Sequence, residues 1–214
     1  MKNLLMSAWI LTFGVPAVAT ADTASLEIAR EAFDLRLAGR VDDAVQRLEA
    51  GLAADSTQAV LFYELSRTRM FLMEFEGMQA AIEKAVALAP DNADYHYFAG
   101  LATAYSLINA AHRGREEQAK QFAGSIIEEL ESALRCDPDH HEARCLLVQQ
   151  FSVMAEEMGW DMERAREHAG ILEGKDPVMG VKARANLIPE DQRAQLWERV
   201  VEEYPDRSLA WYEG

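Results

Sequence analysis

The residues with the clearest potential for chemistry lie around one short turn in the C-terminal half of the chain. The run Cys136-x3-His140-His141-x3-Cys145 contains four side chains of the types that bind zinc, although its spacing matches no known zinc pattern. In an oxidising compartment Cys136 and Cys145 could instead form a disulfide across the turn. Both could also remain unpaired, buried thiols. The residues leave these three interpretations open, and the first makes a small metal-binding or redox protein an alternative function.

Sequence motifs of the common enzyme classes are absent from the chain. It contains no Gly-x-Ser-x-Gly, no His-Glu-x-x-His and no phosphate-binding loop. Acidic pairs such as Glu128-Glu129 and Glu156-Glu157 are adjacent in sequence, and adjacent residues do not share a helix face. They are therefore poor candidates for paired acid and base catalysis. We expect a protein that is not an enzyme and that carries no cofactor.

The charge balance excludes two classes of partner. The 214 residues include 21 Lys and Arg against 36 Asp and Glu, which gives a formal net charge of −15. Nucleic acids and anionic membrane surfaces are both bound through positive charge. We therefore expect no nucleic-acid partner and no binding to an anionic membrane surface. No segment after Val18 approaches 18 uninterrupted apolar residues, so we also expect no stable membrane insertion once a signal peptide is cleaved. Half of the residues are hydrophobic, which is enough to form a core.

A repeat of 34 residues sets the expected architecture. From Asp22 onward apolar residues recur at spacings of three and four, which predicts helices. Residues 41–58 shifted by 34 fall on residues 75–92, with matches in side-chain size or turn chemistry. The matched pairs are Val41 and Phe75, Ala44 and Met78, Leu48 and Ile82, Gly51 and Ala85, and Ser56 and Pro90. The small residues Gly51 and Ala85 would let two helices approach closely.

The repeated units resemble the tetratricopeptide repeat (TPR) family, whose signature is W-x2-L-G-x2-Y, then A-x3-F, then P. The second unit reads Phe62-x2-Leu65-Ser66-x2-Arg69, then Met78-x3-Ile82, then Pro90. The first unit reads Ile28-x2-Glu31-Ala32-x2-Leu35, then Ala44-x3-Leu48, then Ser56. Both units depart from the family, because Glu31 and Arg69 stand where it has apolar residues.

The resemblance covers roughly residues 24–205. It implies an all-α fold over 22–214, in which antiparallel helix pairs stack into a right-handed superhelix, an α-solenoid. A plain helical bundle is the alternative that the 34-residue step disfavours. The third unit, with its run 95–100, also looks like secreted bacterial proteins that carry this repeat.

The third unit is longer than the others. Its second-helix pattern is Ile126-x3-Leu130, and Pro90 and Pro138 lie 48 residues apart, 14 more than one repeat. Shared between two antiparallel helices, 14 residues add about two turns to each. We therefore expect an elongated hairpin, 93–113 and 116–136. Its tip carries three basic side chains: His112, Arg113 and Arg115. They could dock an acidic partner, or they could simply end a helix around a capping glycine.

The chain beyond the hairpin continues in helix pairs. A fourth unit runs from His141 to Pro177, with Asp161 as the expected N-cap of its second helix. Asp176 and Pro177 have the pattern of an N-cap followed by a proline at the first helical position. A short pair over 177–186 and 190–203 follows. The segment 208–212 is expected to cover the end of the stack, and self-association through Trp211 is a further hypothesis.

The inner, concave face of such a stack is lined by the first helix of each pair. Aligning the repeats places eight residues on or near this face: Phe33, Arg36, Tyr63, Arg67, Met70, Tyr97, Leu101 and Tyr105. Aromatic rings give contact area at low entropy cost, and arginine pairs with carboxylates. The pattern favours a scaffold that binds a protein or peptide partner with an acidic segment. The alternative is that half of these residues pack between adjacent units.

The first 21 residues have the layout of a secretory signal peptide. Lys2 is followed by a mostly apolar run, Leu4 to Val18, and the run ends in two overlapping small-x-small sites. Cleavage after Ala21 would release a chain that acts in the periplasm or outside the cell. The alternative is an uncleaved anchor, although the run is shorter than the roughly 20 residues that a span needs.

Overall fold

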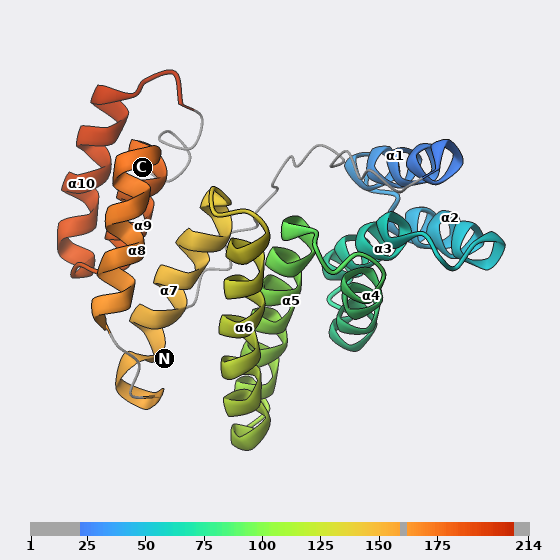
Figure 1. Ribbon diagram of the computed structural model, residues 1–214, viewed down its shortest axis with the longest axis horizontal. Coiled ribbons are helices and arrows are strands. Elements are labelled where there is room, and N and C mark those ends of the chain that lie inside the picture. The colour runs from blue at the N-terminus through green and yellow to red at the C-terminus, as the bar shows by residue number, and fades with distance from the viewer. Residues whose placement is uncertain (1–21, 159–161, 208–214) are drawn as a thin grey trace.

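A computed structural model of the chain describes residues 22–158 and 162–207, and these residues form α-helices without a strand (Figure 1). Ten helices are described: α1 (Thr23–Leu37), α2 (Val41–Ala54), α3 (Ala59–Phe71), α4 (Phe75–Leu88), α5 (Ala93–His112), α6 (Glu116–Cys136), α7 (His141–Met158), α8 (Met162–Lys175), α9 (Pro177–Ala185) and α10 (Glu190–Glu203). Consecutive helices pack as pairs, and the pairs lie side by side along the molecule (Figure 1). The predicted α-solenoid is confirmed.

The elongated hairpin is present where the sequence predicts it. Helices α5 and α6 have 20 and 21 residues, against 13 to 15 in the two pairs that precede them. The pair α9 and α10 also follows the predicted boundaries within one residue. The predicted signal peptide, the N-cap at Asp161 and the covering segment 208–212 lie outside the described residues.

Side-chain caps and turn conformations set several helix boundaries. The Asp22 carboxylate accepts a hydrogen bond from the backbone N–H of Ser25, 2.6 Å away, at the start of α1. Asp176 accepts from the backbone N–H groups of Val178 and Met179, and Pro177 opens α9, as predicted. These caps satisfy donors that the first turn of a helix cannot pair internally.

The turn within each of the first three helix pairs contains a residue with positive φ. Gly39 and Gly114 take this conformation between α1 and α2 and between α5 and α6, with φ of 73° and 69°. Met73, one repeat after Gly39, has φ of 56° in the turn between α3 and α4. Because side chains disfavour this region, the second unit forms the same turn with a strained residue.

The core is divided along the stack into four apolar clusters of described residues, each spanning neighbouring helices. Representative buried members are Leu48 and Leu61, Ile82 and Tyr95, Leu130 and Phe151, and Leu196 and Trp197. Gly51 allows the close approach that the sequence predicts, since a Cβ atom there would lie 3.1 Å from side-chain atoms of Ile28 and Leu61. Stacking therefore buries the apolar face of each pair.

The contacts between pairs also show which side of the stack is concave. The first helices of neighbouring units approach one another: α1 packs on α3, α5 on α7 and α7 on α9, and rings of α3 and α5 meet. The second helices α2, α4, α6 and α8 make no comparable contacts with one another in the part of the chain described. The stack therefore curves toward its first helices, and these line the inner face.

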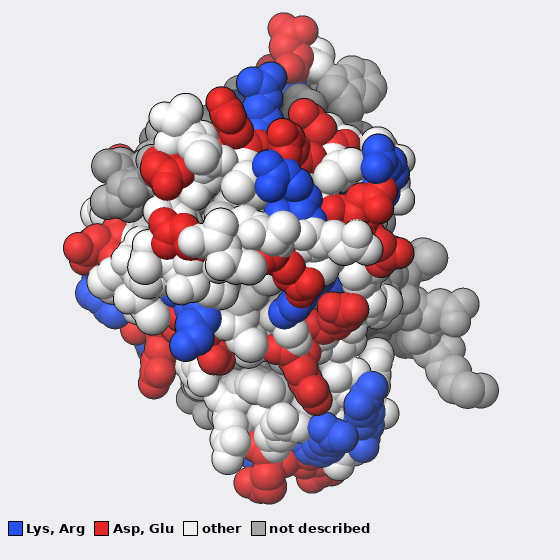
Figure 2. All heavy atoms as spheres, turned by 90° about the vertical axis from the view of Figure 1, so that its right-hand side faces the viewer, with Lys and Arg blue, Asp and Glu red and all other residues white. Residues whose placement is uncertain are grey.

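Acidic side chains dominate the end of the molecule that carries α1 and α2. Figure 2 shows them spread over this face, with Lys and Arg side chains in small groups among them.

No helix within the described ranges is long and apolar enough to cross a membrane.

Candidate functional site

The eight residues predicted for the concave face all lie on first helices, but they divide into two groups by exposure. Phe33 and Arg36 belong to α1, Tyr63, Arg67 and Met70 to α3, and Tyr97, Leu101 and Tyr105 to α5. Buried members are Arg36, Tyr63, Arg67 and Tyr97. Partly exposed members are Phe33, Met70, Leu101 and Tyr105. The partly exposed members form the accessible surface of the concave face, and the buried members form its floor.

The floor contains a buried ion cluster around Glu64. Its carboxylate is fully buried, with Oε2 2.6 Å from Arg36 Nη1 and Oε1 2.7 Å from Arg67 Nη1. Arg36 reaches it from α1, whereas Arg67 stands three residues later on α3 itself. Two guanidinium groups thus share one carboxylate, so the cluster of these three residues keeps one positive charge.

Sequence reasoning had missed Glu64. One signal could have found it: an acidic residue interrupts an apolar stretch of α3 and is spaced i, i+3 from an arginine. A carboxylate in such a stretch must be buried with a partner.

Arg36 is only partly satisfied by these neighbours. Its Nη1 also donates to Thr68 Oγ1 at 2.8 Å, but its Nη2 is buried without a hydrogen-bond partner within the described residues. Burial lowers the pKa of Arg36, and the Glu64 charge opposes that change. The Arg36 guanidinium lies 5.5 Å from the centre of the Phe33 ring, which holds it by a cation–π contact.

The buried tyrosines pack between units. Tyr63 lies 4.9 Å from the Tyr95 ring centre and 5.6 Å from that of Phe98, so it joins α3 to α5. Tyr97 lies 4.9 Å from the ring of His140, between α5 and the start of α7. Burial raises the pKa of both phenols well above the usual range. Truncating either ring would damage the core, so neither is a clean probe of recognition.

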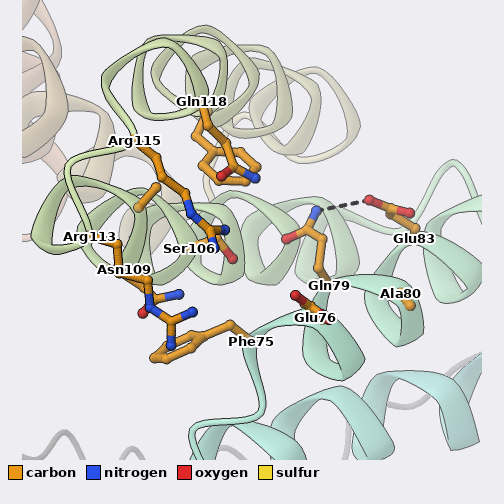
Figure 3. A pocket seen from close by; sticks show the side chains of 12 residues that line it. Phe75, Glu76, Gln79, Ala80, Glu83, Ser106, Asn109, Arg113, Arg115 and Gln118 are labelled. Atoms are coloured by element: carbon orange, nitrogen blue, oxygen red, sulfur yellow. Dashed lines mark hydrogen bonds between the residues drawn. The ribbon is translucent and has the colours of Figure 1, made fainter.

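The basic tip of the hairpin borders a hollow. His112, Arg113 and Arg115 are exposed, and a cavity of about 290 Å³ lies between the tip and α4. Figure 3 shows Arg113 and Arg115 on one side of this cavity and Glu76 and Gln79 of α4 on the other. The sequence predicts the basic tip but not the cavity, which arises because α5 and α6 extend past the start of α4.

The two cysteines at the predicted chemical corner are not joined in a disulfide. Cys136 is exposed, with its thiol 3.8 Å from the backbone oxygen of Pro90, and Cys145 is buried. Partial desolvation and the nearby Asp91 raise the pKa of the Cys136 thiol, which leaves less of it as the reactive thiolate.

The two histidines of this corner face different partners. His140 caps α7, because its Nδ1 accepts from the backbone N–H of Ala143 at 3.2 Å, and its Nε2 lies 3.3 Å from Asp94. The Nδ1 of His141 lies 3.9 Å from Asp176, near the start of α9. No group of three or more potential ligands in residues 22–158 and 162–207 is placed to hold a metal ion. The four residues of the corner therefore do not form such a group.

Comparison of the sequence with known proteins identifies no relative. No family model matches the chain, and no curated protein matches it. The fold, in contrast, has many counterparts among solved structures.

Three of these counterparts are TPR proteins. TTC0263, a thermophilic TPR protein of Thermus thermophilus, is 16% identical, with a TM-score of 0.66 over 88% of this chain and 96% of its own. YrrB, described as a TPR protein with an unusual peptide-binding site, is also 16% identical (TM-score 0.54, 88% and 90% coverage). The first TPR of Spaghetti (RPAP3), bound to the HSP90 peptide SRMEEVD, is 19% identical (TM-score 0.51, 64% and 99% coverage). The predicted resemblance is thus confirmed at the level of fold.

Proposed function

From this TPR fold, we propose that the chain is a non-enzymatic scaffold that binds an acidic segment of a partner protein or peptide on its concave face. Arg36 carries the proposal. Its Nη2 is buried, has no hydrogen-bond partner among the described residues, and belongs to a cluster with one excess positive charge. An unsatisfied buried donor costs about 1–3 kcal/mol, and the excess positive charge beneath the concave face would attract a carboxylate of a ligand bound above it.

The surroundings of the cluster suit a peptide that also has apolar side chains. Phe33, Met70 and Leu101 are partly exposed on the same three first helices. The last residues of α1 and α3, Leu37 and Phe71, are 60% and 49% exposed at the ends of these helices. Apolar contacts of this kind would supply affinity, while the arginine pair would select for negative charge.

Two structural counterparts support the proposal. The RPAP3 domain was solved with a peptide that contains two glutamates and an aspartate, and YrrB is described by its peptide-binding site. We propose that the same kind of ligand binds here.

Placing a negative charge on the concave face should weaken binding of an acidic peptide. The probe is fluorescein-labelled SRMEEVD, and its affinity is measured by fluorescence anisotropy. Met70→Glu and Leu101→Glu should each lower the affinity about tenfold or more, because like charges at an interface repel. Leu88→Glu is the matched control, since Leu88 is an exposed apolar residue on the second helix α4.

A second peptide, with lysine at the three acidic positions, tests the choice of charge. It should bind the unaltered protein at least tenfold more weakly. Equal affinity for the two peptides would contradict recognition of acidic residues on this face. So would an equal loss of affinity for the acidic peptide in the Leu88 and Met70 variants.

We further propose that the protein acts outside the cytoplasm, in the periplasm or beyond. The support is the basic, apolar and small-residue pattern of residues 1–21. Fusing these residues to alkaline phosphatase, which is active only after export, should give activity in a bacterial host. Replacing two leucines of the apolar run, Leu4→Arg and Leu5→Arg, should abolish that activity. Equal activity of both fusions would contradict export by this segment.

A further inference from the structure

The cavity between α4 and the hairpin tip is a second candidate site, separate from the concave face. Its lining comes from α4, from the last turns of α5 and from the start of α6. The cavity therefore lies between the second helix of one pair and the hairpin of the next. A volume of about 290 Å³ is near the lower end of the range for ligand pockets, roughly 300–1,000 Å³. That size suits a small molecule or a few residues of peptide.

One wall of the cavity is positive and has no internal partner. Arg113 and Arg115 make no ion pair and no side-chain hydrogen bond within the described residues. Most arginines elsewhere in the structure do; for example, Arg47 pairs with Glu31. In a chain with a net charge of −15, two neighbouring arginines at a cavity form a local positive wall that would attract an anionic ligand group.

The opposite wall is negative. Glu76 and Glu83 project from α4, and the Oε1 of Glu83 accepts a hydrogen bond from Gln79 Nε2 at 3.1 Å (Figure 3). Gln79 is held in turn by Thr103, whose hydroxyl lies 3.4 Å from its Oε1, so this wall is tied to α5. Glu76 has no ion-pair partner within the described residues. This wall would attract an ammonium group and repel a second carboxylate.

The surface between the two charged walls combines apolar side chains with the polar Ser106 and Asn109. Phe75 at the start of α4 and Phe122 on α6 are both partly exposed to the cavity, and Ala110 lies buried at its base. The ligand that fits all three parts is therefore an apolar body with a carboxylate at one end and an ammonium at the other.

We propose that this cavity binds a short apolar peptide, two or three residues long, through its free carboxyl and amino termini. The carboxylate pairs with Arg113 and Arg115, the amino group faces Glu76 and Glu83, and the side chains contact the two phenylalanines. A longer peptide could present only one of its termini here, so both free ends define the ligand class. This proposal does not depend on recognition at the concave face.

The test is titration of the full chain with the dipeptide Leu-Phe, measured by isothermal titration calorimetry. Amidating the carboxyl terminus or acetylating the amino terminus removes one charge, and each should weaken binding about tenfold or more. In the protein, the double variant Arg113→Gln, Arg115→Gln should have the same effect. The matched control is Arg193→Gln, Arg199→Gln on α10, because these two arginines are also exposed and unpaired within the described residues.

Three results would overturn the proposal. One is equal binding of the free and capped dipeptides, which would show that the termini are not recognised. Another is an equal loss of dipeptide affinity in the tip variant and in the α10 variant. The third is the absence of any heat of binding at 10 mM dipeptide. Met70→Glu should leave dipeptide binding unchanged, which separates this site from the concave face. Because the altered arginines are exposed, each variant should remain folded, and circular dichroism is the check.

Discussion

Replacing Glu64 with glutamine should destabilise the protein by about 3–5 kcal/mol. The carboxylate is fully buried and is the shared partner of Arg36 and Arg67, at 2.6 and 2.7 Å. Glutamine has nearly the same shape but no charge, so it leaves two guanidinium groups in a desolvated site without compensation. The free energy of unfolding from urea titration, followed by circular dichroism at 222 nm, measures the effect.

The matched control is Glu49→Gln. Glu49 lies 2.8 Å from Arg69, but its side chain is half exposed, and ion pairs in such places contribute at most about 1 kcal/mol. A loss below 1 kcal/mol in the Glu64 variant, or equal losses in the two variants, would show that the cluster is not held by the buried charge.

The same cluster allows stability to be separated from recognition. The triple variant Glu64→Leu, Arg36→Met, Arg67→Leu replaces all three ions with apolar side chains of similar size. Such replacements in other buried ion clusters have been neutral or stabilising, so this variant should recover most of the lost stability. It should nevertheless fail to bind the acidic peptide, because the buried arginine pair is gone.

The fold could be predicted because its main signals are local in sequence. The 34-residue step, the small residue Gly51 and the proline at position 90 each mark where one helix must end or approach another. The length of the α5–α6 hairpin follows from simple arithmetic, since extra residues between two fixed turns must extend both helices. The structure agrees with these boundaries within one residue.

The site was less accessible to sequence reasoning, because it depends on which neighbour each side chain meets. The repeat assigns Arg36 and Arg67 to the concave side, but it cannot show that both turn inward to one carboxylate. At the corner formed by Cys136 and His140, sequence reasoning fails in a different way, because residue types alone suggest a site that the contacts do not form. Its residue types suggest a metal site, while the actual partners are a backbone oxygen and a helix terminus.

Substituting Gly180 with alanine should destabilise the protein by about 3 kcal/mol. A Cβ atom at this position of α9 would lie 2.5 Å from the Cα of Glu173 and 2.7 Å from its backbone nitrogen on α8. Backbone atoms cannot rotate away as a side chain can, so the two helices must separate, and overpacking of this kind costs about 1–3 kcal/mol or more. Thermal unfolding and urea titration of the full chain measure the loss.

Gly174→Ala is the control, and it should have the opposite sign. Gly174 lies on α8, next to Glu173, but a Cβ atom there would meet nothing within 4 Å. Alanine favours a helix over glycine by about 0.5–1 kcal/mol, so this variant should be slightly more stable than the unaltered protein. If both variants lost stability equally, the cost would belong to glycine replacement in general. If neither did, α8 and α9 would not be packed as closely as the stack requires.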